Sequence, residues 1–351
     1  MRIPAMRILS LSLVLLATLC TSTVWAANAP ATNSHPIAIV IHGGAGTISP
    51  KDMTPALEAE YRFMLRKALD TGYGVLRKGG TSLDAVQAAI EIMENSPLFN
   101  AGKGAVFTHD GKNEMDAAVM DGATLKAGAV ADVRHVKNPI ALARLVMEKT
   151  PHVLLVADGA EKFALSQGME LMPASYFYTK QRWDELQRAL KKEGDKTAAV
   201  QEQYPGTTAH GFGTVGAVAL DRYGNIAAGT STGGLTNKMD GRVGDSPIVG
   251  DGTYANNLTC GESGTGTGEF YMRLNLTKDV SDLMEYKGWS LKKAVDYEIY
   301  DKLVKFGGKG SGGLIALDRK GNIVTAFNTT GMYRGWIDTR GHVTVKIFKG
   351  E

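Results

Sequence analysis

The stretch His210-Gly-Phe-Gly-Thr-Val-Gly-Ala-Val-Ala-Leu220 sets one hydroxyl residue, Thr214, between a glycine-rich approach and an apolar run. A short apolar run of valine and alanine with turn residues at both ends is typical of a buried strand. The segment before it, Lys191 to Thr208, is polar, charged and aperiodic, which predicts a mobile surface segment. Because a β-branched side chain has few rotamers, the strand would aim the Thr214 hydroxyl in one direction.

A threonine hydroxyl is a weak nucleophile unless a base lies beside it. An α-amino group, with a pKa of about 7.7–8.0, is one of the few groups suited to that task at neutral pH. Thr214 can carry a free α-amino group only if the Gly213–Thr214 peptide bond is cut. A mobile segment before the bond and a rigid strand after it are what such a cut requires, so the stretch predicts cleavage there.

Downstream of Thr214 the chain contains an internal repeat. Gly216-Ala-Val-Ala-Leu-Asp-Arg-Tyr-Gly-Asn-Ile226 recurs as Gly313-Leu-Ile-Ala-Leu-Asp-Arg-Lys-Gly-Asn-Ile323. Each copy joins two apolar runs by Asp-Arg-x-Gly-Asn, which predicts two similar β-hairpins. Helices are expected between them, after Glu269 and from Ser290 to about Lys305. This mixture favours an α+β fold of antiparallel sheets covered by helices over a doubly wound parallel sheet.

The first half of the chain mixes the same element types. Pro36 to Ile41 predicts a buried strand that ends in a glycine-rich turn, His42-Gly-Gly-Ala-Gly46. Thr54-Pro55 caps a helix that would run to Lys78. A capping box begins a second helix, from Leu83 to about Glu94.

Further elements are expected before the polar segment. They are a hairpin about Asp121-Gly122, a helix capped by Asn138-Pro139, a strand from Val153 to Val156, and helices near Ala160 and Trp183.

The first 26 residues resemble a secretory signal peptide. Arg2 and Arg7 precede an apolar run from Ile8 to Cys20, and Val24-Trp-Ala26 supplies a small-residue cleavage site. The run is too short to span a bilayer. We therefore expect a secreted protein, in a periplasm or a similar space, with no membrane association after residues 1–26 are removed.

Composition narrows the function further. At 351 residues and 44% hydrophobic content, the chain can build a sizeable core. Loss of Arg2 and Arg7 would lower the net charge from +3 to +1 (3 − 2), and no basic run remains. A nucleic-acid partner is therefore not expected. Cys260 would be the only cysteine left, which excludes an intrachain disulfide.

Two glycine-rich motifs suggest other chemistry. Gly229-Thr-Ser-Thr-Gly233 matches the G-x-S-x-G nucleophile elbow of serine esterases, and His42-Gly-Gly44 could imitate their oxyanion loop. An elbow requires a helix directly after the serine, whereas the sequence that follows is typical of a loop. Gly264-Thr-Gly-Thr-Gly-Glu269 fits no phosphate-binding pattern, but its backbone N–H groups could stabilise an oxyanion at a helix start.

Taken in order, the motifs resemble one known family over nearly the whole mature chain, the isoaspartyl peptidase and plant-type asparaginase family of N-terminal-nucleophile hydrolases. The motifs are His42-Gly-Gly-Ala-Gly46, Leu98-Phe-Asn-Ala-Gly102, Gly213-Thr-Val-Gly-Ala-Val218, Thr230-Ser-Thr-Gly-Gly-Leu-Thr-Asn-Lys238, Gly241-Arg-Val-Gly-Asp-Ser-Pro247, Tyr254-Ala-Asn-Asn257, Gly264-Thr-Gly-Thr-Gly-Glu269 and Phe327-Asn-Thr-Thr-Gly-Met-Tyr-Arg334.

The resemblance implies an αββα four-layer sandwich and a precursor that cuts itself at Gly213–Thr214. Residues 27–213 would form an α subunit and residues 214–351 a β subunit of one folded domain, and two αβ units would associate as (αβ)2. The implied activity is hydrolysis of β-aspartyl dipeptides and L-asparagine at the side-chain amide. No organic cofactor is implied.

The resemblance also implies roles for individual residues. Thr214 would be the nucleophile and, through its new amino group, the base. Thr232, Thr230 and Asn100 would assist it. Arg242 would bind the substrate α-carboxylate and Asp245 its α-ammonium. The substrate site would comprise Arg242, Val243, Gly244, Asp245, Thr265, Gly266, Thr267 and Gly268, with Thr265 and Gly266 as oxyanion donors.

A structural sodium ion is implied as well. It would be held mainly by backbone carbonyls of the loop before and around Asn100, at Met93, Glu94, Ser96, Phe99, Ala101 and Lys103.

Three residues leave the fine substrate preference open. Asp251 stands where relatives commonly carry a small residue, and Asn275 and Thr277 lie in a stretch that is often alanine-rich. Glycosylasparaginases share the fold and are the nearest alternative. Their nucleophile usually follows aspartate, whereas Gly213 precedes Thr214 here, which favours the isoaspartyl peptidase side.

Overall fold

The structure is a computed structural model that describes residues 35–196 and 213–351. The expected signal peptide and most of the expected mobile segment lie outside the described residues. No helix in the described part of the chain is long and apolar enough to cross a membrane.

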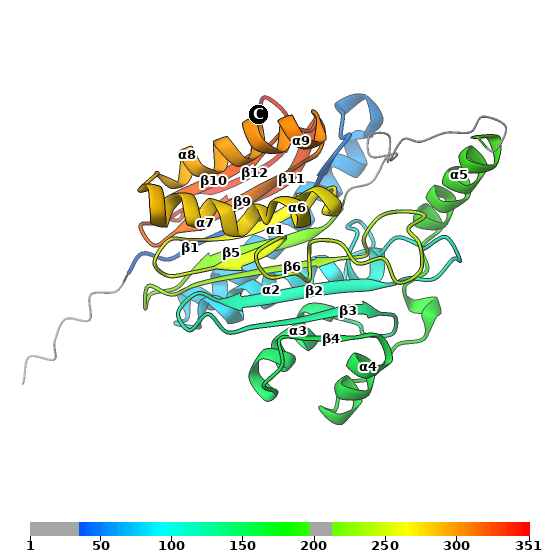
Figure 1. Cartoon of the computed structure of the whole chain (residues 1–351), viewed down its shortest axis with the longest axis horizontal. Helices are drawn as coiled ribbons and strands as arrows, with labels where there is room; N and C mark the ends of the chain where they lie inside the picture. Colours follow the sequence, from blue (N-terminus) through cyan, green and yellow to red (C-terminus); the bar gives the residue numbers. More distant parts are fainter. Residues whose placement is uncertain (1–34, 197–212) are drawn as a thin grey trace, which may run out of the picture. The chain divides into compact units, whose positions relative to one another are not determined.

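Two sheets form the centre of the fold (Figure 1). The larger has the strand order β12-β11-β1-β5-β6-β2-β3-β4, and the smaller has the order β10-β9-β8-β7. All pairs are antiparallel except β3 with β4. The strands of the larger sheet are β1 (Ala38–Gly46), β2 (Met115–Asp121), β3 (Ala127–Val133), β4 (Leu154–Val156), β5 (Val215–Leu220), β6 (Ile226–Thr232), β11 (Gly331–Ile337) and β12 (Val343–Phe348). Those of the smaller are β7 (Thr253–Ala255), β8 (Cys260–Gly266), β9 (Gly312–Asp318) and β10 (Ile323–Phe327).

Helices cover the outer face of each sheet. Those before Thr214 are α1 (Pro55–Arg77), α2 (Ser82–Glu94), α3 (Pro139–Lys149), α4 (Ala157–Ser166) and α5 (Lys180–Lys196), with short 3-10 turns at Pro50–Asp52, Gly102–Gly104 and Ala174–Tyr176. Those after it are α6 (Gly268–Leu274), α7 (Leu276–Lys287), α8 (Leu291–Asp296), a π-helical segment (Tyr297–Lys302) and α9 (Leu303–Gly307).

Three apolar cores hold these layers together. One lies between α1, α2, α3 and the larger sheet, where Leu65, Ile90 and Ile140 are fully buried. A second lies between the two sheets and includes Val218 and Ile315. The third lies under α7 and α8 against the smaller sheet. The predicted α+β class and αββα sandwich are therefore confirmed.

The two predicted helix caps are confirmed, because each depends only on residues within one helical turn. The Thr54 hydroxyl accepts from the backbone N–H of Leu57 at the start of α1. Thr81 and Asp84 form the expected capping box at the start of α2. The repeat is confirmed as well, since its copies form the hairpins β5–β6 and β9–β10, one in each sheet.

Four boundary predictions were wrong. The strand predicted to end at Ile41 continues as β1 to Gly46, because the glycines pair with β11 after a bulge between His42 and Gly44. The hairpin about Asp121-Gly122 is wider, with residues 122–126 between its strands. Lys191 to Lys196, predicted as irregular, continue α5. The helix from Ser290 is divided by the π-helical segment.

Candidate active site

Thr214 lies directly before β5 with its side chain directed to Thr232 of β6. Its Oγ1 lies 3.0 Å from Oγ1 of Thr232 in a hydrogen bond that either hydroxyl can donate. The backbone N–H of Gly234 donates to the Thr232 oxygen at 2.9 Å. The Thr214 hydroxyl is therefore held by a neighbour that is itself fixed, as the strand prediction required.

Asn100 holds the other end of the Gly213–Thr214 bond. Its backbone N–H donates to the Gly213 carbonyl oxygen at 3.1 Å. Its side chain donates to Gly234 O at 2.7 Å and accepts from Val106 N at 3.0 Å. Because Asn100 is fully buried and bound on both sides, it fixes the carbonyl that Thr214 would attack.

Thr214 faces a small pocket, which we call the nucleophile pocket. Its volume is about 10 Å³, about what one water needs. It is lined by Thr214, Thr232, Gly234, Leu235, Arg242, Gly244, Asp245, Ser246 and Gly266. Six of these were predicted site residues. Gly234, Leu235 and Ser246 were missed, although all three lie inside the quoted motifs.

Arg242 carries the positive charge of this pocket. Its Nε and Nη2 donate to the two carboxylate oxygens of Glu269 at 2.9 and 3.0 Å. Its Nη1 is the nearest guanidinium atom to the sites that a Cβ would occupy on Gly234 and Gly244. Glu269 therefore orients one edge of the guanidinium, and the edge with Nη1 turns to the pocket wall. Glu269 was not predicted as a site residue, although it closes one of the motifs.

Asp245 supplies the pocket's carboxylate. Burial raises its pKa to about 7, and the charge of Arg242 opposes that rise only in part. Within the described part of the chain, its Oδ2 has no hydrogen-bond partner. A buried carboxylate oxygen without a donor carries a desolvation cost that a cationic ligand would relieve.

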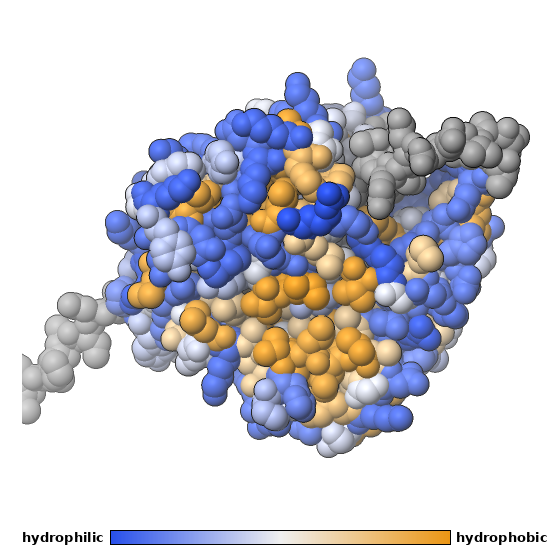
Figure 2. Space-filling view, viewed as in Figure 1, coloured by the Kyte–Doolittle hydropathy of each residue, from blue (hydrophilic) through white to orange (hydrophobic). Residues whose placement is uncertain are grey.

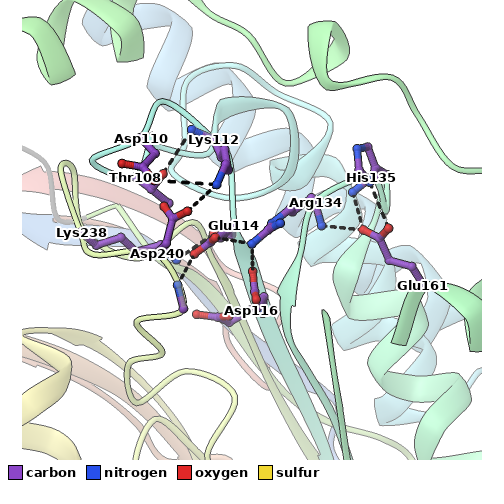
Figure 3. A network of polar contacts seen from close by, with 12 residues as sticks. Thr108, Asp110, Lys112, Glu114, Asp116, Arg134, His135, Glu161, Lys238 and Asp240 are labelled. Carbon is purple, nitrogen blue, oxygen red and sulfur yellow. Dashed lines mark hydrogen bonds and ion pairs between the residues drawn. The ribbon is translucent and has the colours of Figure 1, made fainter. Parts of the chain in front are cut away.

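A partly buried network fixes the loop that carries Arg242 (Figure 3). Glu114 accepts from Gly241 N at 3.0 Å and from Arg134 Nη2 at 2.8 Å. Lys238 donates to the backbone carbonyl of Glu114 at 3.0 Å. Burial lowers the pKa of Lys238, opposed by the nearby charges of Asp116 and Glu114. The residue before Arg242 is thus tied to the start of β2.

The predicted oxyanion donors lie at the end of β8. Gly266 lines the nucleophile pocket. The Thr265 hydroxyl is buried and accepts from Ala45 N at 3.1 Å, which ties β8 to the glycine run of β1. Gly268 packs against Arg242 and Asp245, since an added Cβ would lie 2.9 Å from a polar atom of each. Val243 and Thr267 do not line the pocket.

Thr230 belongs to a separate chain of buried hydroxyls. Its Oγ1 lies 2.7 Å from Ser263 Oγ and accepts from Thr253 at 2.6 Å. Ser263 in turn lies 2.9 Å from Nε2 of His42. The chain joins β6, β7, β8 and β1 behind the pocket, so Thr230 supports the site from behind.

The esterase alternative fails on the same strand. Ser231 lies inside β6, not at a turn into a helix, and donates to Glu94 at 2.7 Å. Burial lowers the pKa of His42 to about 3, which makes its imidazole a poor base at neutral pH. His42-Gly-Gly44 is part of β1 and not a free oxyanion loop.

The residues predicted to hold sodium form a compact loop. Met93 and Glu94 end α2, where the last carbonyls carry the negative end of the helix dipole. A Cβ added at Gly102 would lie 2.4 Å from the Glu94 carbonyl oxygen, and one added at Gly104 would lie 2.1 Å from the Phe99 carbonyl oxygen. The Glu94 carboxyl instead accepts from Ser231, Asn138 and Ile140, and burial raises its pKa to about 8. Ser96, Ala101 and Lys103 complete the loop. Three carbonyls of this loop, those of Met93, Phe99 and Ala101, accept backbone hydrogen bonds from Ser96, Ala101 and Gly104, and the sodium site stays a prediction.

Side-chain ligands are a different matter. The described residues contain no group of three or more His, Cys, Asp or Glu side chains that could hold a metal ion.

Comparison with known proteins matches the chain on both sides of the Gly213–Thr214 bond. The model of a family described as asparaginase matches residues 35–347. Isoaspartyl peptidase of Escherichia coli (strain K12) is 51% identical over 298 residues, which cover 85% of this chain and 92% of the relative. Isoaspartyl peptidase/L-asparaginase of Danio rerio is 44% identical over 317 residues, covering 89% and 96%. Plant-type L-asparaginase of Pyrococcus furiosus is 44% identical over 301 residues, covering 84% and 94%.

Proposed function

This chain belongs to the asparaginase family, and on that premise we propose that it is a threonine hydrolase that cleaves β-aspartyl dipeptides and L-asparagine at the side-chain amide. The observation that carries the proposal is the place of Thr214. Its hydroxyl adjoins a bond whose carbonyl Asn100 holds, in a pocket that Arg242 and Asp245 line.

The first step of the proposal is self-cleavage. The Thr214 Oγ attacks the Gly213 carbonyl carbon, and the C–N bond breaks as the amide nitrogen takes a proton. Water then hydrolyses the resulting ester and leaves a Gly213 carboxylate and a free Thr214 amine. The N–H of Asn100 already donates to the oxygen on which negative charge develops.

Catalysis then uses the same hydroxyl on a second carbonyl. Asparagine and β-aspartyl peptides carry an α-carboxylate and an α-ammonium on one carbon, with the scissile amide on the side chain. The free edge of Arg242 can bind the carboxylate, and Asp245 the ammonium. The backbone near Thr265 and Gly266 would receive the oxyanion, and the Thr214 amine would move the proton.

The size of the nucleophile pocket supports this order of events. At about 10 Å³ it has room for about one water while Gly213 is still attached, and not for an amino acid. Activity therefore requires self-cleavage for two reasons. It frees the Thr214 amine that acts as the base, and it makes room for the substrate.

The glycosylasparaginase alternative is not favoured. The relatives reported above match 84–89% of the chain and are named isoaspartyl peptidase or asparaginase. Gly213, and not aspartate, precedes the nucleophile.

Substrate choice tests the proposal directly. Purified mature protein should hydrolyse β-Asp-Leu and L-asparagine but leave α-Asp-Leu intact, because an α-peptide bond consumes the carboxylate that Arg242 would bind. Amino-acid analysis of the three reactions measures this. Equal turnover of α-Asp-Leu and β-Asp-Leu would refute the charge-pair account of the pocket.

A structural sodium ion is part of the proposal, held by the carbonyls of the loop 93–103. The ion would stabilise the loop that carries Asn100. The protein should therefore unfold at a higher temperature in sodium chloride than in choline chloride at equal ionic strength. Equal unfolding temperatures in the two salts would refute a sodium site.

Export is also proposed, on the pattern of residues 2–26. The mature chain should begin at Ala27 in a periplasm or a similar space. N-terminal sequencing of the exported protein decides this, since a retained Met1 would contradict it.

The proposed (αβ)2 assembly has an apolar surface to use. β4 is an edge strand of the larger sheet, and Val153, Leu154 and Val156 are 51%, 39% and 52% exposed. Figure 2 shows apolar side chains gathered where Figure 1 shows β2, β3 and β4. Exposed apolar edges favour association. Sedimentation should find two αβ units in the wild type and one in Val156→Lys; a wild type with a single unit would contradict the proposal.

A further inference from the structure

A fully buried tyrosine, Tyr271 of α6, packs against the end of β8 that lines the nucleophile pocket. Its hydroxyl donates to the carbonyl oxygen of Gly313 at 2.7 Å and to that of Thr265 at 3.2 Å. Burial raises the pKa of Tyr271 well above the usual tyrosine value of about 10, so the hydroxyl stays protonated and remains a donor at neutral pH. One side chain therefore holds a carbonyl of β8 and a carbonyl of β9.

Two glycines of the run Gly264-Thr-Gly-Thr-Gly268, together with Gly312 of β9, make room for this ring. A Cβ added at Gly264 would lie 2.8 Å from ring atom Cε1, and one added at Gly266 would lie 2.8 Å from Cε2. A Cβ added at Gly312 would lie 2.5 Å from the hydroxyl oxygen. Real Cβ atoms do not approach other atoms so closely, so the backbones of β8 and β9 lie directly against Tyr271.

The hydrogen bond to Thr265 also fixes the direction of the next N–H. The Thr265 carbonyl and the Gly266 N–H belong to one planar peptide group, which is trans. In a trans peptide group the C=O and the N–H point in opposite directions. Because Tyr271 holds the oxygen, it also holds the direction of the N–H, in a residue that lines the nucleophile pocket.

The same short helix also contacts Arg242. Glu269, which precedes Tyr271 in α6, accepts from Nε and Nη2 of Arg242 at 2.9 and 3.0 Å. α6 therefore touches both the group proposed to bind the substrate carboxylate and the strand end proposed to stabilise the oxyanion. Tyr271 contacts only the strand end through its hydroxyl, so mutation can separate the two contacts.

We propose that Tyr271 is a positioning residue that aligns the Gly266 N–H with the oxyanion formed when Thr214 attacks the substrate's side-chain carbonyl. This inference rests on the proposed hydrolysis of L-asparagine and β-aspartyl dipeptides. Self-cleavage does not share the requirement, because the N–H of Asn100 already donates to the Gly213 carbonyl oxygen. Loss of the Tyr271 hydroxyl should therefore slow hydrolysis but not self-cleavage.

Tyr271→Phe tests the inference, because it removes one hydroxyl and keeps the ring. A time course by denaturing mass spectrometry should find self-cleavage at the wild-type rate. Steady-state kinetics should then show kcat lowered about tenfold for both L-asparagine and β-Asp-Leu, with KM changed less than about twofold. The loss falls on kcat because the oxyanion forms only after binding. It is smaller than the roughly 100-fold or greater cost of deleting a donor, because the Gly266 N–H is misaligned and not removed.

Tyr254→Phe is the matched control. Tyr254 is another buried tyrosine of the smaller sheet, but it packs in the core between the two sheets and pairs with Glu262, nearer the start of β8. This variant should keep kcat and KM within about twofold of the wild type.

Three results in Tyr271→Phe would overturn the inference and leave the proposed function standing. They are an unchanged kcat, a raised KM with normal kcat, and self-cleavage slowed as much as hydrolysis, which would show a general structural role. A kcat loss of the same size in Tyr254→Phe would overturn it as well. No hydrolysis of either substrate by the wild type would overturn the proposed function itself.

Discussion

Asn100 explains why a glycine precedes Thr214. A Cβ added at Gly213 would lie 2.5 Å from the Cβ of Asn100, closer than real side chains approach. The same Asn100 donates its N–H to the Gly213 carbonyl. A larger residue would have to move the carbonyl away from that donor, so the glycine serves the geometry of the Gly213–Thr214 bond.

The guanidinium of Arg242 gives a sharp residue-scale prediction. Its planar group can bind Glu269 on one edge and a substrate carboxylate on the other, which a lysine ammonium cannot reproduce. Arg242→Lys should therefore lose about 1.5–3 kcal/mol of transition-state binding, a roughly 10- to 150-fold fall in kcat/KM for L-asparagine. Arg66→Lys, in an exposed pair with Asp70, is the control. An Arg242→Lys enzyme as active as wild type would show that the substrate carboxylate is not bound by two guanidinium N–H groups.

Asp245 predicts the pH dependence of activity. Burial raises its pKa to about 7, so below that pH it is protonated and cannot pair with a substrate ammonium. The Thr214 amine, with a pKa of about 7.7–8.0, must also be neutral. The slope of log kcat/KM against pH should thus be about 1 between the two pKa values and about 2 below them. A slope that stays at 1 down to pH 5.5 would exclude Asp245 from this role.

The raised pKa of Asp245 also makes stability depend on pH, in the direction opposite to that of most aspartates. The folded state holds the Asp245 proton more tightly than the unfolded chain, whose aspartates have a pKa of about 3.9. This group therefore favours folding at low pH, and its contribution is lost as the pH rises from about 4 to about 7.

At the scale of elements, the loop before Arg242 depends on the start of β2. The two carboxylate oxygens of Glu114 accept from Gly241 N and from Arg134. In a Glu114→Gln variant an NH₂ group replaces one of these oxygens, so a donor would face a donor. Glu114→Gln should raise KM for L-asparagine several-fold, with kcat less affected, because Arg242 is misplaced while Thr214 is not. Steady-state kinetics measures the two constants.

Glu161→Gln is the control for that variant. Glu161 also accepts from Arg134 N and from His135, but it does not contact the loop before Arg242. It should change stability without changing KM. A KM that rises equally in both variants would show that Glu114 acts through the fold in general.

At this scale, the sequence predicted the features whose interacting residues lie close together in the chain. The caps at Thr54 and Thr81 lie within one helical turn, and both were found. The extension of β1 through Gly46 was not, because glycines form a strand there only by pairing with β11, almost 300 residues away. Glu269 was missed as the partner of Arg242 for the same reason, since nothing local fixes that pair.

Across the whole molecule, the Gly213–Thr214 bond lies directly before β5, in the middle of a sheet that both parts of the chain build. β1 belongs to the part before Thr214, yet it pairs with β5 on one side and β11 on the other, both from the part after it. β6 pairs with β2 in the same way. The proposed cleavage would therefore expose an amine without dividing the sheet, and the two resulting chains should stay together in native conditions.

The most direct test of this account is the mass of the chains in the purified, active protein. Denaturing mass spectrometry should find a β chain of 351 − 213 = 138 residues that begins at Thr214. Hydrolysis of β-Asp-Leu should increase in step with that chain. Thr214→Ala should remain one uncut chain without activity. A wild-type protein that hydrolyses β-Asp-Leu while its Gly213–Thr214 bond is intact would contradict the account, because no free amine would then exist at the nucleophile.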